Sequence, residues 1–216
     1  MVRELLFWAS GRPARDPGAR ALLLPIAIGT VPGVLAGLLL LKKVESMRTV
    51  GLIGASMLVA CVYFLAAEAS ARRRAGRERS LPEINGADAL WIGVAQAAAG
   101  LMAGFSRSGF TISTARVRGI SREDSARFSF LLALPIILGA GAKALLDLRR
   151  HSGPSVGGAS LAAGFLASAV VGYFAVRFLL RYLKTHTLAP FAVYLGLLGA
   201  GLLVGSLWMG KPLFGG

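Results

Sequence analysis

Residues 86–118 read GADALWIGVAQAAAGLMAGFSRSGFTISTARVR, and this stretch decides the fold. Its first half is a largely apolar helix pattern with a polar Gln96 in the middle, and its second half gathers serines, threonines and arginines around glycines. Long apolar segments lie on both sides of it. Non-helical backbone at membrane depth is tolerated only where it lines a polar cavity or is buried in protein. We therefore expect a re-entrant helix pair around residues 86–124.

The rest of the chain is unusually apolar. Of its 216 residues 55% are hydrophobic and 16% are charged, and the mean hydropathy is +0.66; soluble domains carry roughly 25% charged residues. A helix needs about 20 apolar residues to cross a bilayer. Six stretches meet or approach that length: 21–41, 49–69, 86–104, 126–146, 157–180 and 189–209. The sequence therefore predicts an all-α integral membrane protein with about six hydrophobic helices, forming a single polytopic domain over residues 1–216.

The charge balance favours lipid partners. The formal net charge is +14, and the basic residues lie mostly between the apolar stretches. Such a placement is typical of the positive-inside bias and of contact with anionic head groups, so we expect membrane lipids and no nucleic acid as partners. The basic loop 72–79 favours a cytoplasmic side, but 42–48 is basic too, and charge alone leaves the orientation open. Glu68 is interpreted as a helix-end charge, and the single Cys61 excludes a disulfide framework.

Arg107 is the centre of the candidate site. A guanidinium binds phosphate with two parallel hydrogen bonds, and hydroxyl groups can donate to the other phosphate oxygens. Gly104 and Gly109 allow tight turns and close approach of the backbone. A helix beginning near residue 108 would add the positive field of its N-terminus. The hydroxyl neighbours are Ser106, Ser108 and Thr111. The segment therefore indicates a phosphate or diphosphate cradle, with an ordinary interfacial loop as the alternative.

Three motifs carry a family resemblance. They are GVAQ at 93–96, GFSRSGFTI at 104–112 and ARFSFLLALP at 126–135. In this order and spacing they closely resemble the undecaprenyl-diphosphate phosphatases of the bacitracin-resistance (BacA/UppP) type. The signature of that family is PGxSRSxxT, followed by a Phe-Ser-Phe-Leu-Leu-x-x-Pro helix.

The resemblance implies a fold, a reaction and a location. The chain would form the second part of an inverted-repeat fold in the bacterial inner (plasma) membrane, with an active site that faces the extracytoplasmic side. It would hydrolyse undecaprenyl diphosphate, a polyprenyl diphosphate lipid, to undecaprenyl phosphate and phosphate. This recycles the carrier for peptidoglycan synthesis and gives bacitracin resistance. The implied catalytic residues are Arg107, Ser106 and Thr111, and the implied substrate-binding residues are Ser108, Gly104 and Gln96.

The chain departs from the family pattern in two places. Ala103 replaces the first proline of the signature, and the family's N-terminal motif of paired glutamates, serines and a histidine is not found. A divalent cation, Mg²⁺ or Ca²⁺, is expected from the family, but its ligands are not found in this chain, and no metal-ligating residue is assigned. Residues 5–8 resemble the last turns of a helix. We therefore expect a chain that is N-terminally truncated relative to the family.

Several alternatives stay open. The start of the reading frame lies upstream, or the gene is a degraded remnant, or the short chain is a genuine non-hydrolytic relative. In function, the alternatives to hydrolysis are binding or transport of a polyprenyl phosphate without hydrolysis, an inactive truncated homologue, and a structural membrane subunit. The GxxxG pattern at 201–205 is compatible with a homodimer.

Overall fold

The computed structural model describes residues 21–40, 44, 49–74, 76–150 and 157–209, except for the side chains of 148–150. In these ranges the chain forms helices and no strand. The elements are α3 (Leu23–Leu39), α5 (Val50–Arg72), the 3-10 turn η1 (Leu81–Glu83), α6 (Gly86–Leu101), α7 (Arg107–Val117), α8 (Arg122–Arg150), α9 (Gly158–Tyr182) and α10 (Ala189–Trp208). The interpretation of residues 5–8 as a helix end falls outside the described residues.

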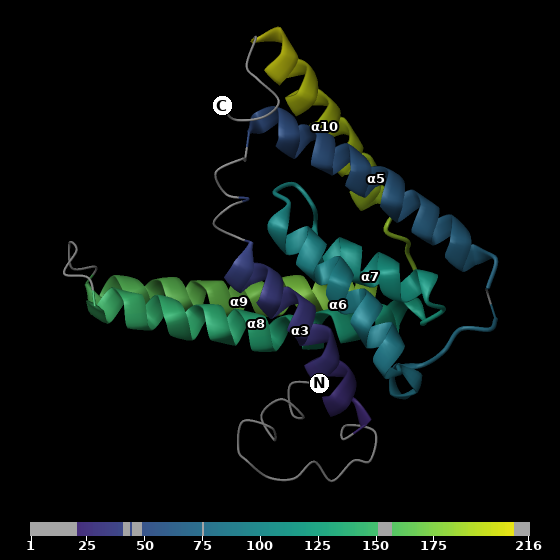
Figure 1. Cartoon of the computed structure of the whole chain (residues 1–216), viewed down its shortest axis with the longest axis horizontal. Helices are drawn as coiled ribbons and strands as arrows, with labels where there is room; N and C mark the ends of the chain where they lie inside the picture. Colours follow the sequence, from purple (N-terminus) through teal and green to yellow (C-terminus); the bar gives the residue numbers. More distant parts are fainter. Residues whose placement is uncertain (1–20, 41–43, 45–48, 75, 151–156, 210–216) are drawn as a thin grey trace.

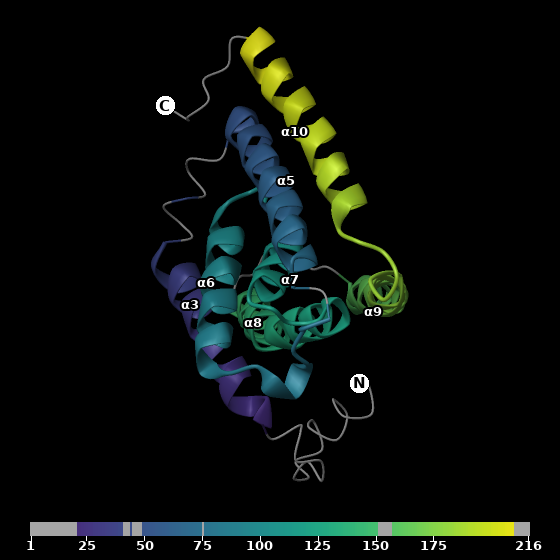
Figure 2. The same ribbon diagram turned by 90° about the vertical axis from the view of Figure 1, so that its right-hand side faces the viewer.

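The helices form a central group with two pairs around it. Helices α6 and α7 lie at the centre, and α5 and α10 run side by side along one flank of them (Figures 1 and 2). Helices α8 and α9 both extend away from this group in the view of Figure 1, whereas Figure 2 shows them apart from each other. Helix α3 packs against α6 and crosses the start of α8. The candidate site is therefore carried by the most enclosed helices of the described chain.

Glycines let two of these helix pairs approach closely. A Cβ built on Gly93 of α6 would lie 2.4 Å from the carbonyl oxygen of Gly29 on α3. On the other flank, a Cβ on Gly199 of α10 would lie 2.8 Å from the carbonyl oxygen of Gly54 on α5. Small residues at such crossings are what membrane helices use to bring their backbones together. The glycines at these two crossings therefore serve packing.

The fold class is confirmed. All six apolar stretches are helical, and each predicted range overlaps one helix. In the described part of the chain, four helices are long and apolar enough to cross a membrane: α5, α8, α9 and α10. Helix α3 with 17 residues and α6 with 16 residues are shorter. The chain is therefore an all-α, multi-pass membrane protein in which two of the six apolar helices are shorter than a span.

The pair α6–α7 occupies the predicted range 86–124. Helix α6 begins with a capping box in which Asn85 accepts from the backbone N–H of Asp88 at 2.9 Å. Helix α7 begins at Arg107, close to the predicted start, and Ser106 caps it by accepting from the N–H of Gly109 at 3.3 Å. Between the two helices, residues 102–106 reverse the chain direction. This is the geometry expected of a re-entrant pair.

The structure adds two details to the sequence analysis. Helix α8 begins at Arg122, ahead of the apolar stretch 126–146, where the hydroxyl of Ser121 accepts from the N–H of Asp124 at 3.2 Å. Glu68 lies one turn before the end of α5, and it is 5% exposed and forms an ion pair with Arg122. This ion pair joins segments that sequence periodicity does not connect.

Candidate functional site at the Arg107 turn

The turn that precedes α7 depends on Gly104. Its φ of +94° lies in the region that favours glycine. A Cβ at this position would also lie 2.7 Å from the carbonyl oxygen of Ile53 on α5. Gly104 therefore allows both the turn itself and its close approach to α5. The contact lies near the start of α5, opposite to the end that carries Arg72.

Arg107 is held by Gln96. The side-chain oxygen Oε1 of Gln96 accepts from Nε of Arg107 at 3.2 Å and from Nη2 at 2.8 Å. This contact joins the middle of α6 to the first residue of α7. It uses two of the five N–H groups of the guanidinium and leaves three for a ligand. The arginine is therefore oriented at the start of a helix, where the backbone field also favours an anion.

The side-chain amide nitrogen of Gln96 is available as a donor to a ligand. Its side chain is 2% exposed, and among the described residues its Nε2 has no hydrogen-bond partner. A Cβ built on Gly33 of α3 would lie 3.3 Å from this nitrogen, so the amide faces α3 across a small gap. A buried donor without a partner costs about 1–3 kcal/mol. The arrangement is therefore suited to a ligand oxygen that accepts from Gln96.

The three hydroxyl residues lie in two different environments. Ser106 and Ser108 are half-buried at the start of α7, beside Arg107. Thr111 is 1% exposed, and its hydroxyl bonds the carbonyl of Arg107 at 3.0 Å and the hydroxyl of Ser129 on α8 at 2.5 Å. Thr111 thus ties the first turn of α7 to α8, whereas the two serines flank Arg107 in the chain. The structure brings all the predicted site residues into one segment of α6–α7.

Aromatic side chains pack behind the turn. The ring of Phe110 stacks on Phe105 with 4.4 Å between ring centroids and on Tyr63 of α5 with 4.7 Å. The hydroxyl of Tyr63 bonds that of Thr114 at 2.7 Å. These contacts lock α7 against α5 and reduce the freedom of the segment that carries Arg107. Sequence reasoning did not single out Tyr63 or Phe105, because their contacts depend on how α5 and α7 pack.

An ion-pair network holds the other end of the same helices. The carboxylate of Asp88, which is fully buried at the start of α6, pairs with Nη1 of Arg79 at 2.8 Å and with Nε of Arg118 at 2.8 Å. Burial alone would raise the pKa of Asp88, but the hydrogen bonds from Arg79 and Arg118 outweigh it and place that pKa below its ordinary value. The backbone of Arg79 also pairs with the α7–α8 turn. Asp88 therefore closes the α6–α7 pair at the end opposite to Arg107.

The polar groups at the Arg107 turn do not by themselves fit a divalent cation. They are amide, hydroxyl and guanidinium groups, whereas Mg²⁺ and Ca²⁺ prefer carboxylate oxygens. Among the described residues no group of three or more His, Cys, Asp or Glu side chains is placed to hold a metal ion. What these residues can do is bind and orient an anion.

The fold defines a helical membrane protein in which Arg107, held by Gln96, lies at the turn between α6 and α7. A sequence model of the family described as "Bacitracin resistance protein BacA" matches residues 2–201. The chain belongs to this family.

Curated relatives agree with this assignment. A protein named undecaprenyl-diphosphatase from Chlorobaculum tepidum is 40% identical over 184 residues, which cover 83% of this chain and 65% of that protein. One of the same name from Anaeromyxobacter dehalogenans is 41% identical over 198 residues, covering 90% of this chain and 64% of the relative. Undecaprenyl-diphosphatase 2 from Mesorhizobium japonicum is 37% identical over 211 residues, covering 94% and 78%. The chain thus spans somewhat less than two thirds of the first two relatives.

Proposed function

We propose that the Arg107 turn binds the diphosphate of undecaprenyl diphosphate and takes part in removing its terminal phosphate. Water supplies the oxygen that joins the terminal phosphorus, and the bond from that phosphorus to the bridging oxygen breaks. The products are undecaprenyl phosphate and inorganic phosphate. The family and the names of the relatives support this substrate class.

The observation that carries the proposal is the guanidinium of Arg107 held by Gln96 at the N-terminus of α7. Charge on the phosphoryl oxygens is stabilised by fixed donors that need no reorganisation during the reaction. Arg107, Ser106 and Ser108 would contact the diphosphate, and the amide of Gln96 would donate to it. Gly104 would let the backbone approach, and Thr111 would keep the first turn of α7 in place through Ser129.

We also propose a location in the bacterial plasma membrane, with the site opening to the extracytoplasmic side. The basic residues of 72–79 gather at one end of the helices, and a cytoplasmic position for them agrees with the positive-inside rule. The Arg107 turn packs near Ile53, close to the opposite end of α5.

Phosphate release tests the function. The purified chain in detergent receives undecaprenyl diphosphate with Mg²⁺ or Ca²⁺, which the family implies, and released phosphate is measured. Arg107→Ala is expected to lower kcat/KM by about a hundredfold or more, the usual effect of losing a donor to a developing oxyanion. Gln96→Leu is expected to lower it by about tenfold, because Arg107 loses its orienting partner. Arg177→Ala, which removes an exposed arginine on α9, is the matched control and should keep full activity.

Two results would contradict the proposal. Release that Arg107→Ala leaves unchanged would refute the site. Saturable binding of the lipid without release would refute hydrolysis by this chain, and would establish the alternative of a lipid-phosphate binding protein.

A further inference from the structure

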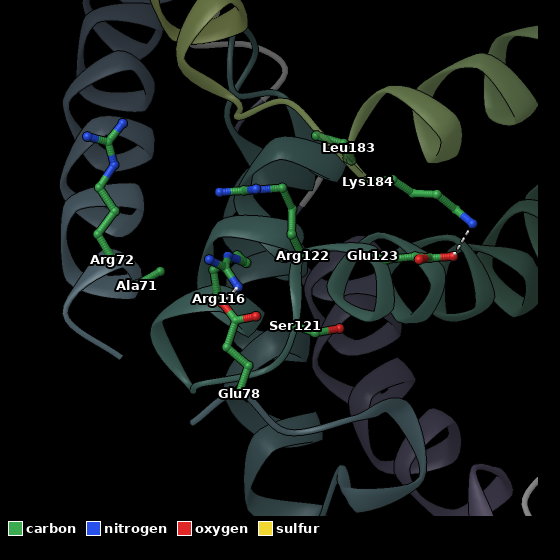
Figure 3. A pocket seen from close by; sticks show the side chains of 9 residues that line it. All are labelled: Ala71, Arg72, Glu78, Arg116, Ser121, Arg122, Glu123, Leu183 and Lys184. Atoms are coloured by element: carbon green, nitrogen blue, oxygen red, sulfur yellow. Dashed lines mark hydrogen bonds and ion pairs between the residues drawn. The ribbon is translucent and has the colours of Figure 1, made fainter. Parts of the chain in front are cut away.

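A polar, partly open cavity lies at the arginine-rich end of the helices. It has a volume of about 390 Å³ and is lined by the end of α5, the loop that carries Glu78, the end of α7, the start of α8 and the loop between α9 and α10 (Figure 3). Because a water molecule occupies about 30 Å³, the cavity has room for a phosphate group with several waters. Arg107 and Arg116 stand at opposite ends of α7, about 14 Å apart along the helix axis. The cavity is therefore distinct from the Arg107 site.

Basic side chains outnumber acidic ones around this cavity. The basic residues are Arg72, Arg116, Arg122 and Lys184, and the acidic ones are Glu78 and Glu123. The four basic residues come from four separate segments, and the guanidinium of Arg122 extends toward α5 (Figure 3). Arg72 has no ion pair with any described residue. Lys184 pairs with Glu123 at 3.1 Å, and Arg116 and Arg122 have acidic partners too, so the excess of positive charge in the lining comes from Arg72.

The ion pairs of Arg116 and Arg122 do not use all the N–H groups of these two arginines. Nη1 of Arg116 pairs with Glu78 at 2.6 Å, and Nη2 of Arg122 pairs with Glu68. Within the described part of the chain, however, Nε of each of these two arginines is buried without a hydrogen-bond partner. Arg116 is only 4% exposed. A buried guanidinium whose donors are not all paired is costly, and an anion in the adjoining cavity would offset part of that cost through its attraction to both guanidinium groups.

We propose that this cavity binds a phosphate group, either from an anionic lipid head group or from inorganic phosphate. Phosphate offers several acceptor oxygens in a tetrahedral arrangement, which suits donors that converge from four segments. In the proposed orientation the neighbouring basic loop would face the cytoplasmic leaflet, where anionic head groups are enriched. Bound phosphate would join α5, α7, α8 and the α9–α10 loop at the end of the molecule opposite to the Arg107 turn.

Equilibrium dialysis with radiolabelled inorganic phosphate tests the proposal. Every measurement uses the full chain carrying Arg107→Ala, so that the other site does not contribute and failure of the proposed function leaves this result readable. We expect saturable binding of one phosphate per chain. Arg72→Gln and Arg122→Gln should each weaken it by about tenfold, as expected for loss of one charge-assisted contact.

Arg73→Gln is the matched control. Arg73 is the exposed neighbour of Arg72, carries the same charge and does not line the cavity. Its substitution should leave phosphate binding unchanged. Absence of saturable binding, or an equal loss in Arg73→Gln and Arg72→Gln, would overturn the proposal, because diffuse surface charge would then explain any attraction. Arg72 is exposed, so its variant tests the site without a threat to folding.

Competition separates the two sources of phosphate. Soluble dihexanoyl phosphatidic acid is added to the phosphate-loaded chain, with dihexanoyl phosphatidylcholine as the control. Displacement by phosphatidic acid alone assigns the cavity to a lipid head group. If neither lipid displaces the bound phosphate, the cavity is assigned to inorganic phosphate. Equal displacement by both lipids would contradict a site that selects an anionic phosphate.

Discussion

At the scale of single residues, the site depends on positions where no other side chain fits. Gly109 follows the capping serine of α7 by three residues, and the ring of Phe64 on α5 lies directly against it. A Cβ on Gly109 would meet Cζ of Phe64 at 2.1 Å, a distance at which one of the two must move. The glycine therefore sets how closely the arginine-bearing helix packs against α5.

Gly109→Ala tests this packing. We expect it to destabilise the protein by about 1–3 kcal/mol, the usual cost of overpacking a core. Thermal unfolding in detergent measures the effect. The second change Phe64→Leu should recover part of the loss by removing the opposing ring atoms. Gly100→Ala is the control, because a Cβ there meets nothing within 4 Å. An unchanged unfolding temperature in Gly109→Ala would show that α5 and α7 are packed more loosely.

At the scale of elements, one carboxylate organises the α6–α7 pair. Asp88 caps the start of α6 and pairs with Arg118 at the end of α7 and with Arg79 in the preceding loop. The two helices are thus joined at one end by Asp88 and at the other by Gln96 and Arg107. Because both ends are fixed, α7 cannot slide freely along α6, and Arg107 keeps its position relative to Gln96.

Asp88→Asn is expected to destabilise the chain at pH 7 by about 1–3 kcal/mol. This is less than for a fully buried ion pair, because both arginine partners are about one third exposed. The pKa of Asp88 is lower in the folded chain than its ordinary value of 3.8. The carboxylate therefore stabilises the fold above pH 3.8, and this stabilisation is lost as the pH falls through the lower pKa of the folded chain. The difference between parent and variant should therefore vanish in acid. Unfolding temperatures recorded from pH 7 to pH 2 measure it; a difference independent of pH would contradict this role.

At the scale of the whole molecule, six helix ends meet at one side. The ends of α5, α7 and α9 and the starts of α6, α8 and α10 gather there, together with the ion pairs of Glu68, Glu78, Asp88 and Glu123. Such a concentration of charge is costly in the hydrocarbon layer, so we expect it to lie at one membrane boundary. Met209, after the end of α10, lies at the opposite end of that helix.

Cysteine labelling tests the proposed orientation. In a Cys61→Ser background, Met209→Cys should react with a membrane-impermeant maleimide added to intact spheroplasts. Arg77→Cys, in the basic loop, should react only after the membrane is permeabilised. Both positions are exposed, so access to the reagent decides the result. The reverse pattern would place the Arg107 turn toward the cytoplasm.

The sequence by itself determined the helices, the re-entrant pair and the residues around Arg107. Hydrophobic runs and cap residues are local signals, and the turn chemistry of 102–109 is contained in a few consecutive residues. The tertiary structure alone decided which side chains meet. Gln96 holds Arg107 from another helix, and Glu68 pairs with Arg122, which lies 54 residues further along the chain. Such partners depend on how helices pack, and periodicity within one helix does not encode that packing. For the same reason the cavity lined by α5, α7 and α8 became visible only in three dimensions.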